Sequence, residues 1–174
     1  MIKFLKAAPV AFLMGTIVAG ILYQRTSSEI WFTLAITFGT TAYHFIMRWL
    51  VAFIYNSIMH NRADYKKRWY RVSEAEKRFY EKLRVKKWKK SMPTYNPKLF
   101  DPKQHTWDEI AQATCQAELG HETIAVLSFV PILAGHWLGG YTAFIITSIL
   151  ASAFDMMFVF MQRYNRQRIL KLIK

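Results

Sequence analysis

The sequence predicts an all-α, polytopic membrane protein with four transmembrane helices and a cytoplasmic interfacial helical segment between the second and third spans. Apolar residues make up 53% of the 174 residues. They are concentrated in four runs that each approach the roughly 20 helical residues needed to cross a bilayer core. Lys and Arg lie almost entirely outside these runs. We therefore treat residues 1–174 as a single membrane domain.

The four expected spans differ in length. The second is long enough to tilt or to extend into the cytoplasm. The first follows two lysines and could instead be a cleaved signal peptide, but the three further apolar runs favour a membrane anchor. The spans are expected at about residues 7–23, 30–59, 123–138 and 141–161.

The distribution of positive charge indicates the partners. The formal net charge is +13, and 15 of the 24 Lys and Arg residues lie at 62–103, with five more from Arg163 onward. Basic clusters beside hydrophobic spans usually meet anionic lipid head groups. Nucleic acid is not expected as a partner, because a nucleic-acid module has no need of apolar spans.

The same distribution predicts the orientation. The loops at 24–29 and 135–140 carry almost no charge, whereas the central segment at 60–122 and the tail at 162–174 are strongly basic. By the positive-inside rule, both termini and the central segment are therefore cytoplasmic in a multi-pass protein of the cell membrane. Aromatic residues at the outer span ends agree with this orientation, since such rings prefer the interface: Tyr23, Trp31, Trp137 and Tyr141.

Two capping boxes predict helices in the central segment. Ser73 with Glu76 opens a helix that is mostly basic outside one apolar face, and such a helix suits the membrane surface. Thr106 with Glu109 opens a second helix, and no strong breaker intervenes before Pro131. This second helix is therefore expected to continue into the third span. The apolar face of the first helix consists of Ala75, Phe79 and Leu83.

Polar residues occur within two of the spans. His44 and Arg48 lie four residues apart in the second span and so share one side of the helix. Asp155 lies at a comparable depth in the fourth span. Charged groups inside a membrane are costly and usually meet a counter-charge or a polar cavity. Two interpretations follow: a buried ion pair between Arg48 and Asp155, or a pocket that holds the head group of a substrate.

A third candidate site lies where the third span begins. Glu118 and His121 are three residues apart on one helical face, and a neighbouring carboxylate can orient an imidazole and raise its basicity. A charged helix end at the interface would look similar. Glu-x-x-His is also half of a di-iron site, but no second copy exists, so we expect no metal. Cys115, the only cysteine, has no base next to it in the sequence that would activate it as an acyl carrier.

Four elements recur in order over about residues 83–170: Val85-Lys86-Lys87-Trp88-Lys89, Glu118 with His121, Leu127-Ser128-Phe129-Val130-Pro131-Ile132 and Met161-Gln162-Arg163-Tyr164-Asn165-Arg166-Gln167-Arg168. Together they resemble the glycosyl-4,4'-diaponeurosporenoate acyltransferase family. The first two spans are less similar to that family. The likeness therefore implies membrane acyl transfer more directly than it implies a carotenoid acceptor.

The resemblance implies a membrane acyltransferase. It would move a fatty acyl group from a cytoplasmic thioester such as acyl-CoA, with no other cofactor, to a hydroxyl of a glycolipid, carotenoid glycoside or related lipid. His121, oriented by Glu118, would act as the base. A non-enzymatic lipid-binding or scaffold protein, or another lipid-modifying enzyme such as a methyltransferase, is the alternative. The residues expected to bind substrates are His44, Arg48, Asp155, Lys86, Lys87, Trp88, Lys89, Arg163, Asn165 and Arg166.

The orientation can be tested by chemical labelling. In a variant that lacks Cys115, a cysteine introduced at Ser27 should react with an impermeant reagent in intact cells, whereas one at Ser91 should react only after permeabilisation. Labelling of position 91 in intact cells would show that the predicted orientation is wrong.

Overall fold

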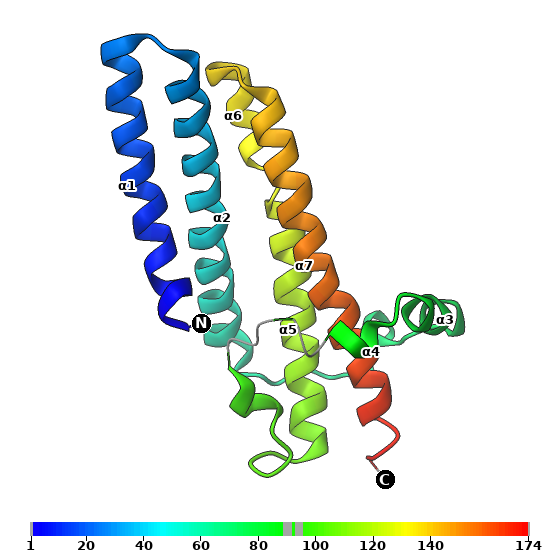
Figure 1. Ribbon diagram of the computed structural model, residues 1–174. Coiled ribbons are helices and arrows are strands. Elements are labelled where there is room, and N and C mark those ends of the chain that lie inside the picture. The colour runs from blue at the N-terminus through cyan, green and yellow to red at the C-terminus, as the bar shows by residue number, and fades with distance from the viewer. Residues whose placement is uncertain (1, 89–91, 93–95, 174) are drawn as a thin grey trace. The chain divides into compact units, whose positions relative to one another are not determined.

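The computed structural model describes residues 2–88, 92 and 96–173, with side chains from residue 7 onward. This part of the chain contains helices and turns and no strand (Figure 1). The elements are α1 (Ile2–Thr26), α2 (Glu29–Met59), η1 (Arg68–Tyr70), α3 (Glu74–Lys82), α4 (Val85–Trp88), η2 (Pro97–Phe100), α5 (Trp107–Leu127), α6 (Pro131–Leu138) and α7 (Tyr141–Ile169), where η marks a 3₁₀ helix.

Four helical segments of the described chain are long and apolar enough to cross a membrane. They are Ala7–Thr26, Glu29–Met59, Trp107–Leu138 and Tyr141–Ile169. The third consists of α5 followed by α6, so the second capping box does lead into a span without an earlier interruption. The predicted class, an all-helical membrane protein with four spans, is confirmed.

The chain divides into two compact units. Unit one comprises Met1–Val51 and Ile124–Phe154, and unit two comprises Ala52–Thr123 and Asp155–Lys174. Helices α2, α5 and α7 contribute residues to both units. The two are described separately below.

In unit one, α1 packs against the first part of α2. The ring of Phe12 stacks on that of Phe45, with centroids 5.8 Å apart. Gly15 lies against Phe38, and a Cβ at position 15 would come within 2.9 Å of that ring. The missing side chain thus lets the helices approach closely, a common device between membrane helices because lipid gives them little hydrophobic reason to associate.

Pro131 explains why the third span is divided into two helices. Proline lacks the N–H that would donate to the carbonyl of Leu127, four residues earlier, and its ring disturbs the turn before it. The freed Leu127 carbonyl accepts a hydrogen bond from the Tyr43 hydroxyl of α2 at 3.0 Å and from the Val130 N–H at 3.1 Å. A backbone group freed within a span must find another partner, because lipid supplies none. Tyr43 therefore stabilises the break.

Two glycines make the turn from α6 to α7. Gly139 and Gly140 have φ values of 68° and 66°, a left-handed backbone that costs glycine little and other residues more. At position 140 a Cβ would also come within 2.6 Å of Ile36 Cδ1. The two glycines therefore permit a tight turn, because neither carries a Cβ that would strain the backbone or meet Ile36.

In unit two, one face of α5 holds the segment that follows α2 through hydrogen bonds. Gln116 accepts from the Asn61 N–H at 2.6 Å and donates to Asn56 Oδ1 at 2.6 Å. Further toward the start of α5, the Tyr65 hydroxyl donates to Asp108 at 2.7 Å. These bonds satisfy polar groups that would be costly to leave unpaired.

Both predicted capping boxes are present. Ser73 Oγ accepts from the Glu76 N–H at 3.2 Å, and Glu76 accepts from the Ser73 N–H at 2.8 Å. At the start of α5, Glu109 accepts from the Thr106 N–H at 2.8 Å, while Thr106 Oγ1 accepts from the Glu109 N–H at 3.3 Å. Each box satisfies two backbone donors that the helix cannot satisfy itself.

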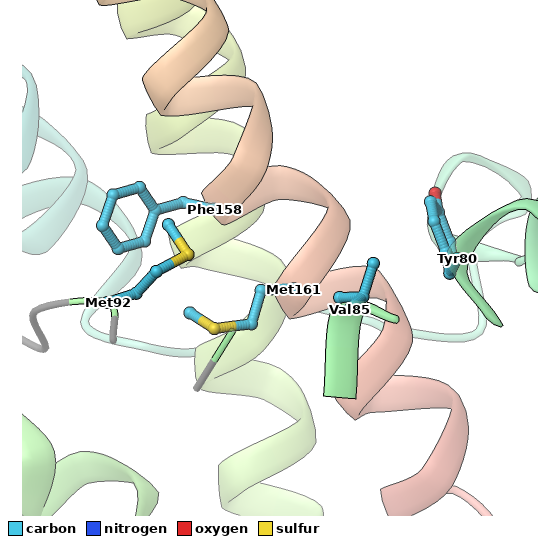
Figure 2. Close-up of a cluster of buried hydrophobic side chains, with 5 residues drawn as sticks. All are labelled: Tyr80, Val85, Met92, Phe158 and Met161. Atoms are coloured by element: carbon cyan, nitrogen blue, oxygen red, sulfur yellow. The ribbon is translucent and has the colours of Figure 1, made fainter. Parts of the chain in front are cut away.

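An apolar cluster attaches α3 and α4 to the unit-two part of α7. Its buried members come from α3, α4, the residue at position 92 and α7 (Figure 2): Tyr80, Val85, Met92, Phe158 and Met161. The side chain that α3 buries is therefore Tyr80. The face expected to meet the membrane surface remains exposed, which leaves it available for that role: Ala75, Phe79 and Leu83.

The hydrogen bond at the proline break can be measured by a double-mutant cycle. Tyr43→Phe should lower the free energy of unfolding by about 0.5–1.5 kcal/mol, the usual net contribution of one hydrogen bond. In a Pro131→Ala background the cost should be smaller, because residue 131 then has an N–H for the Leu127 carbonyl. Unfolding in mixed micelles measures both values, with Tyr23→Phe as a control. Equal costs in the two backgrounds would contradict this role for Tyr43.

Candidate active site

A buried carboxylate lies between two arginines on the second face of α5. Glu118 is fully buried. Its Oε1 lies 2.5 Å from Arg163 Nη1, and its Oε2 lies 2.5 Å from Arg166 Nη1. Both arginines come from the last turns of α7, so the carboxylate joins α5 to α7. A buried charge requires such partners, because desolvation would otherwise cost several kcal/mol.

The Arg163 guanidinium uses all of its N–H groups within the protein. Nε donates to Glu76 Oε1 at 3.1 Å, and Nη1 donates to Glu118 and to the Trp69 carbonyl at 3.1 Å. Nη2 donates to the Arg71 carbonyl at 2.9 Å and lies 2.9 Å from Glu76 Oε1. A guanidinium has five N–H donors, so none is left for a substrate.

Arg166 is also committed within the protein. Its side chain is fully buried, Nη2 donates to the Tyr70 carbonyl at 2.9 Å, and the guanidinium carbon lies 5.1 Å from the centre of the Tyr70 ring. Together the two arginines fix η1 and its flanks through the carbonyls of residues 69–71. We call Glu76, Glu118, Arg163 and Arg166 the Glu118 network.

The electrostatics of the network favour its charged form. Burial raises the pKa of the Glu76 carboxyl, but hydrogen bonds from Ser73 and the charge of Arg163 outweigh burial, so this pKa lies below its ordinary value. Burial raises the pKa of Tyr70 to about 12, so that this phenol stays neutral at physiological pH. By contact, two carboxylates face two guanidiniums in the network.

The carboxylate that contacts His121 comes from α7. Asp155 Oδ1 lies 2.9 Å from His121 Nδ1, and the imidazole stacks on Phe158 with ring centroids 4.5 Å apart and planes inclined by 6°. Asp155 is buried, whereas the His121 side chain remains 25% exposed. The imidazole is thus held at one nitrogen and along one face, with an exposed part left over.

Residues of two predicted roles have other partners in the structure. Glu118 was expected to orient His121, but the arginines of α7 occupy Glu118 and Asp155 contacts the imidazole. Arg163 and Arg166 were expected to bind the phosphates of the donor. The donors of Arg163 are used on Glu118, Glu76 and backbone carbonyls, and Arg166 is buried beside Glu118 and the Tyr70 carbonyl; binding of the donor's phosphates by these arginines stays a prediction. The physical reason is the same in both cases: a buried carboxylate attracts the nearest cations.

The remaining candidates lie on several elements. Lys86 and Lys87 are exposed on α4, and Trp88 packs against the apolar cluster. Lys89 lies outside the described residues. Asn165 is half-buried on α7. Their role in binding a donor stays a prediction.

His44 and Arg48 belong to unit one. His44 is 4% exposed, and Arg48 Nη1 donates to the His44 carbonyl at 3.1 Å. Asp155 belongs to unit two. An intramembrane pocket formed by these three residues, or an ion pair between Arg48 and Asp155, stays a prediction.

Sequence reasoning missed Trp69 and Tyr70 and recognised Glu76 only as a capping residue. The carbonyls of Trp69 and Tyr70 accept from the arginines, and any residue type supplies a carbonyl, so no side-chain pattern could have identified them. An aromatic pair within a basic run was the available signal.

The Glu118 network makes a prediction about stability. Glu118→Gln leaves two arginines with one carboxylate. We therefore expect the free energy of unfolding to fall by roughly 3–5 kcal/mol, the usual cost of removing one member of a buried ion pair. Glu81→Gln removes the same charge from an exposed position of α3 and should have little effect. Unfolding free energies in mixed micelles would compare the two variants. A Glu118→Gln protein as stable as Glu81→Gln would show that the network contributes little.

Comparison with known proteins identifies the family. The family described as Glycosyl-4,4'-diaponeurosporenoate acyltransferase matches residues 66–174, more than half of the chain. The matched region contains the whole Glu118 network, His121 and Asp155. No curated protein and no solved structure matched. The resemblance seen in the sequence is confirmed, and the chain belongs to the glycosyl-4,4'-diaponeurosporenoate acyltransferase family, a family of acyltransferase enzymes.

Proposed function

We propose that the protein moves a fatty acyl group from a cytoplasmic thioester, such as acyl-CoA, to a hydroxyl of a glycolipid, carotenoid glycoside or related lipid acceptor. The observation that carries this proposal is the pairing of His121 with the buried Asp155. Membership of an acyltransferase family supports the reaction type. The four apolar helices support a lipid acceptor, since a membrane enzyme meets its lipids in the bilayer.

His121 would act as the general base. An ionised Asp155 can only accept a hydrogen bond, so Nδ1 of His121 carries the proton and Nε2 keeps its lone pair. Nε2 then removes the proton from the acceptor hydroxyl. The carboxylate also stabilises the imidazolium that forms, as a third group does in other nucleophile–base–orienter arrangements. Phe158 fixes the ring plane against rotation.

The reaction balances without any further reactant. The acceptor oxygen attacks the thioester carbonyl, and a tetrahedral intermediate forms. The carbon–sulfur bond then breaks, and the imidazolium returns its proton to the departing thiolate. The products are an ester and a free thiol. The developing oxyanion also needs a hydrogen-bond donor, and Arg48, Asn165 and Trp88 remain the candidates.

The donor would approach from the basic, cytoplasmic side. Lys86 and Lys87 are exposed on α4, and lysine is a common partner of phosphate as a point charge. This assignment agrees with the orientation that the positive-inside rule gives, with both termini in the cytoplasm.

The base can be tested by substitution. His121→Ala should lower the turnover of acyl-CoA with lipid acceptor by about 10²–10⁴-fold, the usual contribution of a positioned base. Asp155→Asn should lower turnover less, with the affinity for acyl-CoA unchanged, because it leaves the base in place but poorly oriented. His105→Ala serves as the control, since His105 pairs with Glu109 near the start of α5.

Two results would argue against this proposal. If His121→Ala kept near-normal turnover and His44→Ala did not, the base would be His44. If no variant or wild-type protein transferred an acyl group, but removal of exposed lysines abolished the cellular phenotype, a lipid-binding scaffold would be the better explanation.

A further inference from the structure

An open groove of about 300 Å³ lies in unit two. Its α7 wall is apolar and consists of Met156, Val159 and Phe160. The remaining lining residues carry polar groups: Trp69, Glu76, Tyr80, Glu122 and Arg163. Such a mixture suits an amphipathic ligand, because a hydrocarbon part can lie along α7 while a polar head group reaches the other side.

Two carboxylates of the described chain line the groove, and only Glu122 has an oxygen left for a ligand, because both oxygens of Glu76 accept hydrogen bonds within the protein. The Trp69 indole N–H donates to Glu122 Oε2 at 3.1 Å. Among the described residues no donor bonds to Glu122 Oε1, which leaves that oxygen free to accept. Arg163 also lines the groove, but its N–H groups are already used in the Glu118 network.

The charge in the groove is therefore negative. Within the Glu118 network two guanidiniums balance two carboxylates, and Glu122 adds a further negative charge at the groove. A phosphate about 6 Å from such a carboxylate would be disfavoured roughly 100-fold at an effective dielectric constant of about 20. A neutral hydroxyl would instead donate a charge-assisted hydrogen bond to Oε1.

Two residues that line the groove are sequence neighbours of the proposed base and its carboxylate. Glu122 follows His121 on α5, and Met156 follows Asp155 on α7. Consecutive Cα atoms are about 3.8 Å apart. Successive side chains on a helix point about 100° apart, so this spacing places the groove on a face next to that of the His121–Asp155 pair.

We infer that this groove binds the acceptor and that Glu122, held by Trp69, selects uncharged, hydroxyl-bearing head groups over phosphate-bearing ones. The inference rests on the proposed acyl transfer for its biological meaning. The head-group preference itself can be measured without any acyl donor. Trp69, which is 63% exposed, supports the choice, because an aromatic ring offers a large uncharged surface with a polar N–H at one edge.

Two probes with the same chain and different head groups test the inference. Dodecyl glucoside and dodecyl phosphate are titrated separately into the full-length protein in phosphatidylcholine nanodiscs, and native mass spectrometry gives each Kd. The wild type should bind the glucoside at least roughly tenfold more tightly than the phosphate. This ratio is below the roughly 100-fold effect of the unscreened charge, because salt and solvent weaken the repulsion. Glu122→Gln should abolish that preference, mainly by tightening binding of the phosphate.

Two variants keep the result interpretable. Glu122→Asp retains the charge and should retain the preference, whereas Glu81→Gln removes an exposed carboxylate outside the groove and should leave both Kd values unchanged. A wild type without preference, or an equal shift in Glu122→Gln and Glu81→Gln, would overturn the inference. If His121→Ala kept full turnover while the head-group preference held, the proposed base would fail and the groove assignment would stand.

Discussion

The ion pairs of Glu118 are the constraint on which unit two depends. A fully buried carboxylate is tolerable only with cations beside it, and Arg163 and Arg166 of α7 supply them. The same guanidiniums bond to carbonyls at residues 69–71 and so hold η1 against α5 and α7. Trp69, and through it the Glu122 side of the groove, is positioned by these bonds. Loss of Glu118 would therefore disturb the groove as well as the helix contact.

The fold could be predicted from the sequence because its signals are local. The apolar runs and the Ser73 and Thr106 capping boxes each depend on residues within a few positions of one another. The division of the third span at Pro131 was not predicted, although proline is a local signal. The Tyr43 hydroxyl that stabilises the break is different. It lies 84 residues from its acceptor, Leu127, and nothing in the sequence connects the two.

The site was predictable in its composition but not in its pairing. His121 could be recognised as a candidate, and helical spacing pointed to Glu118, three residues before it, as its carboxylate partner. Asp155, 34 residues away, was instead matched with Arg48 by depth. Which carboxylate meets which cation depends on how α5 packs against α7. A single sequence carries little information about that packing.

The involvement of α7 in every part of the site has a consequence for biosynthesis. During synthesis the chain emerges from its N-terminus, so α5 is complete before Asp155, Arg163 and Arg166 exist. Until then Glu118 lacks the cations that contact it, and His121 lacks the carboxylate of Asp155. The site therefore assembles in the last step of translation, when the final helix joins the others. A chain that ends early would retain most of its spans and none of the contacts that α7 makes with Glu118 and His121.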